Sequence, residues 1–138
     1  LSHVAHGVIT PSAQQQLASR LHDVFEGICA VIEEHKPDEA AVEETFVNSN
    51  ARAALILGQA RGVALAAAAR RGLQVAEYAP TTIKKAVVGS GSADKTQIAF
   101  MVRRLLPTAG DVSADAADAL GVALCHAAHG GFRRRAGA

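Results

Sequence analysis

The chain has 138 residues and a mass of 14.2 kDa, which fits one ordinary domain that is long enough to bury a core without disulfides or metal. Hydrophobic residues make up 49% of it, which excludes intrinsic disorder, and abundant alanine with only 4% aromatic residues favours packed helices over an all-β sandwich. The net charge of +1 divides unevenly: residues 1–69 carry 4 basic and 8 acidic side chains (−4), residues 70–138 carry 10 and 5 (+5), and either an anionic partner or ordinary solvated faces explains the split.

The N-terminal third of the chain contains signals for a strand, a long helix and a second strand. The weak alternation of Val4–Thr10 predicts a strand. Ser12 and Gln15 match a capping box, and apolar residues at helical spacing then predict an amphipathic helix that stops before Pro37. A short strand is expected at 40–46, although alanine and glutamate are poor strand formers.

The stretch Asn50–Arg71 predicts a second helix that is apolar around most of its circumference. A helix that is apolar on several sides must be buried on several sides, which in a small domain suggests a partner subunit over one face. Gly58 and Gly62, four residues apart, would let another backbone approach closely. Gly72 is the expected C′ residue after this helix.

The second half continues the alternation of strands and helices. Its predicted elements are a strand at Leu73–Ala79, a short basic helix at Thr82–Val88, a Gly-Ser-Gly loop at 89–91, a helix capped by Ser92 and ended by Pro107, and a helix from Ala114 to about His129 capped by Ser113. The order β-α-β-α-β-α-α-α predicts an α/β layered domain with a mostly buried sheet.

Cysteine usage and hydropathy indicate the compartment. Cys29 and Cys125 both fall in apolar helical patterns, which is typical of a reduced cytoplasmic protein. No run reaches the ~18 apolar residues of a membrane span, and no signal peptide is recognisable. We therefore expect a soluble cytoplasmic protein without a membrane partner.

Two aspartates, Asp115 and Asp118, stand at i and i+3 of the last predicted helix, so their carboxylates share one face. One interpretation is structural, because Asp115 falls in the first turn, where the helix dipole favours an anion. The other is a site for a hard cation, since carboxylate oxygens suit Mg²⁺, which keeps open positions for phosphate. The spacing alone leaves both interpretations open.

Glu43 and Glu44 lie in the short strand at 40–46, where alternation turns one of them inward or toward a cleft at the strand end. Adjacent glutamates are usually solvated, so this signal is weak by itself. Phe46, one of 4 phenylalanines, is either a core residue or an exposed aromatic that stacks on a base. Without further evidence the core interpretation leads.

Basic residues surround the glycine–serine loop: Lys84 and Lys85 precede it, Lys95 follows it, and Arg103 and Arg104 lie on the next predicted helix. Backbone amides of a loop that opens onto a helix N-terminus can contact phosphate. Nearby cations add non-specific, salt-sensitive affinity for a nucleic-acid backbone. The glycine spacing is not that of a nucleoside-triphosphate cradle.

Two C-terminal groups carry weaker signals. Cys125, His126 and His129 invite a metal interpretation, but no second ligand pair has zinc spacing. The run Arg133–Arg135 is typical of a solvated tail that would add phosphate affinity.

Four stretches that hold these residues occur in a recognisable order: Val42-Glu43-Glu44-Thr45-Phe46, Leu57-Gly58-Gln59-Ala60-Arg61-Gly62-Val63-Ala64, Val87-Val88-Gly89-Ser90-Gly91-Ser92-Ala93-Asp94-Lys95 and Ala114-Asp115-Ala116-Ala117-Asp118-Ala119-Leu120. Together they resemble the RuvC family of Holliday-junction resolvases. The resemblance implies a ribonuclease H-like α/β fold, a mixed sheet flanked by helices, in one domain at 1–129 followed by a basic flexible tail at 130–138.

The resemblance further implies a homodimer that cuts four-way DNA junctions symmetrically with Mg²⁺, for which Mn²⁺ can substitute. Glu43, Asp115 and Asp118 match three of the family's four metal-binding catalytic acidic residues, and some relatives have histidine where Asp115 stands. In this mechanism two Mg²⁺ ions roughly 3.5–4 Å apart activate water and stabilise the leaving 3′ oxygen. The products would carry 5′-phosphates.

The same resemblance assigns DNA-binding residues and partners. Lys84 and Lys95 match basic residues implicated in DNA contact and catalysis, and Lys85 flanks the same loop. Phe46 matches an aromatic that stacks on bases near the crossover, and the helix at 50–71 matches the family's dimer helix. The implied partners are four-way junction DNA, a second copy of the chain and the RuvA–RuvB branch-migration complex.

The first residues of the chain depart from the family pattern. The fourth acidic residue of the family lies in an N-terminal strand with the pattern Gly-Ile-Asp-Pro-Gly, whereas Leu1–Thr10 aligns with the third strand. Usual strand and turn lengths place about 20–25 residues before that point. For the chain as it stands we expect poor cleavage or none, which leaves a catalytically inactive junction-binding module as the alternative to an enzyme and a helical dimer unrelated to DNA as a third hypothesis.

Overall fold

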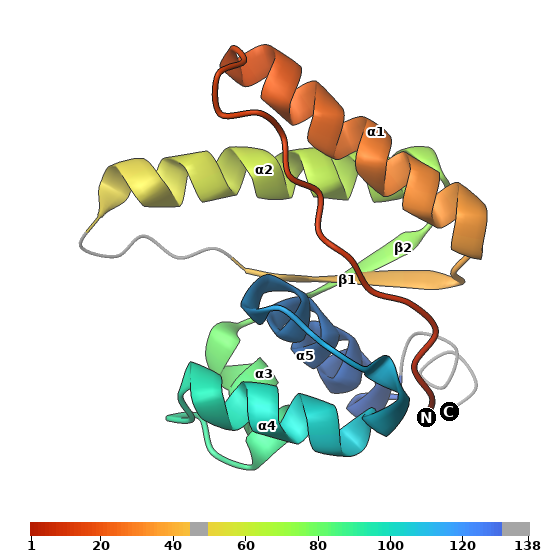
Figure 1. The fold of residues 1–138 in the computed structure, drawn as a ribbon, viewed down its shortest axis with the longest axis vertical. Helices are drawn as coiled ribbons and strands as arrows, with labels where there is room; N and C mark the ends of the chain where they lie inside the picture. Colours follow the sequence, from red (N-terminus) through yellow and green to blue (C-terminus); the bar gives the residue numbers. More distant parts are fainter. Residues whose placement is uncertain (45–49, 131–138) are drawn as a thin grey trace. The chain divides into compact units, whose positions relative to one another are not determined.

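The computed structural model describes residues 1–44 and 50–130. Its elements in chain order are α1 (Leu17–His35), β1 (Glu39–Glu43), α2 (Ala51–Arg70), β2 (Gln74–Tyr78), α3 (Pro80–Val88), α4 (Lys95–Leu105), a 3₁₀ turn η1 (Pro107–Ala109) and α5 (Ala114–Ala128) (Figure 1). The described residues divide by their contacts into two compact units. One is Ile9–Ala76, and the other joins Leu1–Val8 to the residues from Glu77 onward.

The unit Ile9–Ala76 is a pair of helices on a small sheet. α1 packs on α2, and α2 packs on β1. β1 pairs with β2 in a two-stranded parallel sheet, which requires a crossover connection such as α2. The helices are also joined near the end of α2, where the Arg71 guanidinium lies 3.2 Å from Glu33 Oε2. The predicted α/β class is confirmed by this arrangement.

The other unit is built on α3, α4 and α5, which pack on one another. The helix faces in contact are apolar, and their buried side chains include Ile83 and Val87 from α3, Ile98 and Val102 from α4, and Val122 and Cys125 from α5. Gly121 lies at the centre of α5, and a Cβ placed on it would be 3.6 Å from Ile98 Cγ2 and 3.8 Å from Ile83 Cγ2. A methyl group at this position would therefore lie in ordinary van der Waals contact with side chains of α3 and α4.

The helix ends that the sequence predicts are confirmed in part. The Asn50 side chain caps α2 by accepting a hydrogen bond from the Ala53 backbone N–H at 3.0 Å. Gly72 follows α2 with a φ of 74°, the left-handed conformation in which a side chain is unfavourable. The Ser12 cap is wrong, because its hydroxyl accepts from the Gln14 N–H at 3.3 Å in a turn and α1 begins only at Leu17.

The strand predicted at Val4–Thr10 is also wrong, since this segment has no regular secondary structure. A strand needs a neighbour to satisfy its backbone N–H and C=O groups, and none of the described residues pairs with this one. His6 Nε2 instead lies 3.1 Å from the backbone oxygen of Asp111. The alternation of apolar and polar residues indicates which side chains a strand could bury, but it does not indicate whether a second strand is present to pair with it.

Two other predictions concern the whole chain. The domain at 1–129 and the basic tail at 130–138 remain predictions, and residues 131–138 lie outside the described part of the chain. Across the two described ranges, every helix is too short or too polar to cross a bilayer.

Val102 has 0% exposure in the α3–α4–α5 core, and its truncation tests that packing. Val102→Ala is expected to lower the free energy of unfolding by about 2 kcal/mol, because two buried methyl groups are lost and a cavity remains. Urea denaturation followed by circular dichroism measures the change. The exposed neighbour Arg103→Ala serves as the control and should change stability by less than about 0.5 kcal/mol. Equal losses from both variants would contradict the packing.

Candidate functional site

The first two turns of α5 present both candidate aspartates to solvent. Ser113 caps the helix as predicted, with its hydroxyl accepting from the Ala116 backbone N–H at 3.3 Å. Ala116 and Ala117 are each 3% exposed and face the core, so Asp115 and Asp118, one turn apart, lie on the outer side of the helix. The alanine-rich sequence thus packs one face of α5 tightly while the other face carries two carboxylates.

The N-terminus of α4 is fixed by a capping box. Asp94 accepts from the Gln97 backbone N–H at 2.8 Å, and the Gln97 side chain accepts from the Asp94 N–H at 2.9 Å. The predicted cap, Ser92, is wrong, because its hydroxyl is engaged with that of Ser90 at 2.9 Å. A carboxylate two residues closer to the helix takes the position, and Lys95 becomes the first helical residue.

Lys95 and Asp118 meet where α4 packs on α5. Lys95 Nζ lies 3.6 Å from Asp118 Oδ2, with side-chain exposures of 87% and 40%. An exposed ion pair of this kind contributes little to stability. The ion pair matters for chemistry, because it places the Lys95 cation beside Asp118, one of two neighbouring carboxylates.

The other lysines lie on α3, next to the glycine–serine loop. Lys84 is half-buried and Lys85 is exposed. A Cβ on Gly91 would lie 3.3 Å from Lys85 Cε, so the loop passes close to the aliphatic stem of this lysine. Because α3, α4 and α5 pack together, the predicted cations Lys84, Lys85 and Lys95 and the aspartate pair all come from one small bundle.

Glu43 is the last residue of β1 and is exposed. Its backbone oxygen accepts a hydrogen bond from Arg61 Nε at 3.2 Å. Glu43 belongs to the unit Ile9–Ala76, whereas Asp115 and Asp118 lie with Lys95 in the other unit. Phe46 lies outside the described residues.

The donor chemistry of the α5 pair fits a hard divalent cation, since both residues offer carboxylate oxygens with access to solvent. Within residues 1–44 and 50–130, no three or more His, Cys, Asp or Glu side chains are arranged to hold a metal ion. A complete site would therefore need at least one ligand beyond Asp115 and Asp118.

The cysteine and histidines near the end of α5 are engaged in packing. Burial raises the pKa of the Cys125 thiol, which keeps it in the neutral form that binds metals poorly. His129 Nδ1 donates to the Cys125 backbone oxygen at 2.8 Å. His126 Nδ1 lies 2.7 Å from the hydroxyl of buried Tyr78, and both residues belong to the unit that continues from Glu77 onward.

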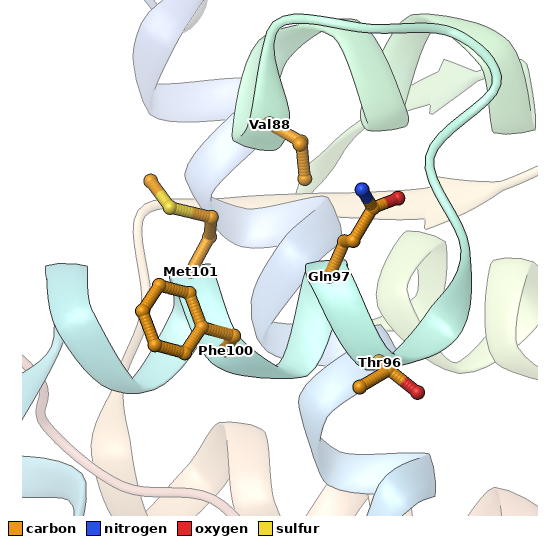
Figure 2. A pocket seen from close by; sticks show the side chains of 5 residues that line it. All are labelled: Val88, Thr96, Gln97, Phe100 and Met101. Carbon is orange, nitrogen blue, oxygen red and sulfur yellow. The ribbon is translucent and has the colours of Figure 1, made fainter.

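An open pocket of about 380 Å³ lies between α3 and α4 and is lined by Val88, Thr96, Gln97, Phe100 and Met101. In Figure 2, Val88 projects from α3 toward α4, while Gln97 and Met101 project toward α3. None of the candidate site residues lines this pocket, and its walls are largely apolar. It offers no acid, base or metal ligand.

Sequence reasoning missed two residues of the site. The sequence motifs assign no role to Arg61, although it is the one charged residue between positions 53 and 69. A single charge in an apolar stretch was the signal from which a specific role of Arg61 could have been predicted. Asp94 was missed because Ser92 matched the cap preference equally well, and only the start of α4 decides between them.

Comparisons with known proteins agree on one family. The sequence model of the family described as "Crossover junction endodeoxyribonuclease RuvC" matches residues 1–126. Proteins of that name from Caulobacter sp. (strain K31) and Hyphomonas neptunium are 64% and 53% identical, over 92% and 100% of this chain and 75% and 83% of their own lengths. The structure of T. thermophilus RuvC in complex with a Holliday junction substrate is similar, with a TM-score of 0.81, 33% identity, and coverage of 90% of this chain and 76% of that one.

Proposed function

The chain belongs to the RuvC family of crossover junction endodeoxyribonucleases, and from this membership we propose that it cuts four-way DNA junctions. The ribonuclease H-like fold of the family follows from the structural match. The observation that carries the proposal is the outward-facing pair Asp115 and Asp118 with Lys95 beside it, within a chain that is 64% identical to a named junction endonuclease. Carboxylates next to a cation suit the hydrolysis of a phosphodiester.

We propose that Asp115 and Asp118, together with Glu43 from the end of β1, are the catalytic carboxylates and hold Mg²⁺, with Mn²⁺ as a substitute. The exposed carboxylate oxygens of α5 support this assignment. When bound, the metal would supply Lewis-acid activation of water and of the phosphate oxygens. Without a bound metal, Lys95 lowers the repulsion between the two aspartates by pairing with Asp118 at 3.6 Å.

The lysines are proposed to bind the phosphate backbone. Lys85 and Lys95 are exposed and Lys84 is half-buried, and all three lie on helices that pack against α5. Their positive charge offsets the phosphate charge next to the carboxylates and gives a salt-sensitive contribution to affinity. Phe46 keeps its proposed role of stacking on a base near the crossover.

We also propose that the protein acts as a homodimer in recombination and repair, with α2 at the interface and the RuvA–RuvB complex as a further partner. Leu55, Ile56 and Leu57 form an exposed apolar run on α2, with exposures of 64%, 46% and 61%. Large apolar side chains that are exposed in a row favour burial against a partner. A two-fold dimer would present two equivalent sites to the two strands of a symmetric junction.

The test is cleavage of a labelled four-way junction by the protein expressed from its full reading frame. With Mg²⁺ we expect paired cuts on opposing strands with 5′-phosphate ends, and no cleavage of a linear duplex of the same sequence. A gel shift in Ca²⁺ measures binding without turnover. Junction binding without cuts in Mg²⁺ or Mn²⁺ would support the inactive binding module, and absence of both binding and cleavage would overturn the junction assignment.

A further inference from the structure

Arg61 on helix α2 makes a hydrogen bond to Glu43 at the end of β1. Arg61 Nε donates a hydrogen bond to the backbone oxygen of Glu43 at 3.2 Å, and both residues lie within the unit Ile9–Ala76. We propose that Arg61 is a positioning residue that fixes the end of β1 and thereby the direction in which the Glu43 side chain projects. This inference rests on the proposed function of Glu43 as a metal ligand.

The end of a strand is where such a contact matters most. β1 ends at Glu43, and the regular ladder of backbone hydrogen bonds does not continue past the end of a strand. The direction of the Glu43 carbonyl is set by the ψ angle of that residue, so a donor that holds the oxygen also holds the backbone that carries the side chain. Arginine suits this role because its guanidinium is rigid, planar and always charged.

The sequence of α2 supports a specific role for this arginine. Arg61 is the only charged residue between positions 53 and 69, whereas the other two arginines of the helix, Arg52 and Arg70, lie near its ends. Arg61 is half-buried on α2, and its guanidinium favours a polar partner. The Glu43 carbonyl supplies one, and α2 packs on β1 so that the contact is made.

The contact also links two proposed features of the protein. Leu57 precedes Arg61 by four residues, so the exposed apolar run of α2 ends one turn before the arginine, on adjacent helix surface. Movement of α2 when that run is covered would reach β1 through the Arg61–Glu43 hydrogen bond.

Residues that orient a metal ligand typically change activity or metal affinity about 10- to 100-fold when they are removed. We expect the loss of Arg61 to fall in that range.

A matched pair of substitutions separates the hydrogen bond from the charge. Arg61→Gln places an amide N–H at the position of Nε, and Arg61→Met places a methyl group there. Both remove the positive charge and keep the aliphatic stem. Arg52→Met, on the same helix, is the control, and circular dichroism reports whether each variant is folded.

The first readout is amide hydrogen exchange over residues 39–44, which needs neither DNA nor metal. Exchange should increase about tenfold in Arg61→Met, consistent with a strand end that opens more often, and should stay near the wild-type rate in Arg61→Gln and Arg52→Met. The second is calorimetric binding of Mn²⁺, where Arg61→Met should weaken affinity about 10-fold or more. Equal behaviour of the Met and Gln variants, or wild-type exchange in Arg61→Met, would overturn the inference.

A failure of the proposed function gives a different result from a failure of the Arg61 inference. If Glu43→Gln still cuts junctions at the wild-type rate, Glu43 is not a ligand and the proposed site is wrong, whatever the exchange data show. If Glu43→Gln is inactive while Arg61→Met exchanges and binds Mn²⁺ like wild type, the proposed site stands and Arg61 has no positioning role.

Discussion

Asp118→Asn is expected to abolish junction cleavage while junction binding survives. Asparagine keeps the size and shape of the side chain but removes the negative charge that favours binding of a hard divalent cation, and it also removes the ion pair with Lys95 Nζ at 3.6 Å. Loss of an outer-shell partner of a metal ligand costs about 10- to 100-fold, so loss of a direct ligand should exceed about 100-fold in cleavage rate. Single-turnover cleavage of a labelled four-way junction in Mg²⁺ measures the rate.

The matched control is Asp111→Asn, which makes the same chemical change at an exposed aspartate just before α5. It should cleave like the wild type, and both variants should bind the junction in Ca²⁺ within about threefold of it, a difference of less than 1 kcal/mol. Undiminished cleavage by Asp118→Asn would remove this residue from the active site. A parallel loss of binding would point to misfolding or to a role in DNA contact.

Leu55→Glu is the second substitution with a large expected effect, on assembly. Leu55 is 64% exposed and belongs to the apolar run of Leu55, Ile56 and Leu57 on α2. If that run is the dimer interface, the new carboxylate would be buried without a partner, which costs about 3–5 kcal/mol and raises the dimer dissociation constant by more than about 100-fold. Sedimentation equilibrium across a range of concentrations measures the constant, and the paired cuts should become unpaired or disappear.

Phe100→Glu is the control for this experiment. Phe100 is 60% exposed on α4, so the substitution places the same charge on an equally exposed apolar residue of another helix. We expect its dimer dissociation constant to match the wild type. An unchanged constant for Leu55→Glu would contradict the proposed interface, and equal weakening by both variants would indicate a general effect of charge.

The helices were the most predictable part of the fold. In α1 and α4, apolar residues recur at helical spacing because one face of each helix packs, and this needs no knowledge of the neighbours. The strand at Val4–Thr10 failed for the opposite reason, since a strand exists only when another segment pairs with it. Capping at Ser12 and Ser92 failed because short polar side chains also bond within turns, and neighbouring residues decide which use prevails.

The individual residues of the candidate site were easier to predict from the sequence than the contacts between them. The i and i+3 spacing placed Asp115 and Asp118 on one face of a helix, and α5 confirms this. The Lys95–Asp118 pair could not be foreseen, because it depends on how closely α4 packs on α5. Arg61 was hidden in the same way, since its partner is a backbone oxygen, which no side-chain motif records.

Lys95 occupies a position that helix energetics disfavour. It is the first residue of α4, where the exposed N–H groups carry partial positive charge, and no acidic residue stands in that first turn. A cation there costs the helix about 0.3–1 kcal/mol, and the Asp94 capping box only offsets it. At this helix end, replacing Lys95 would thus carry a small gain in stability, so a variant library screened by melting temperature alone would not protect the residue that the chemistry is proposed to need.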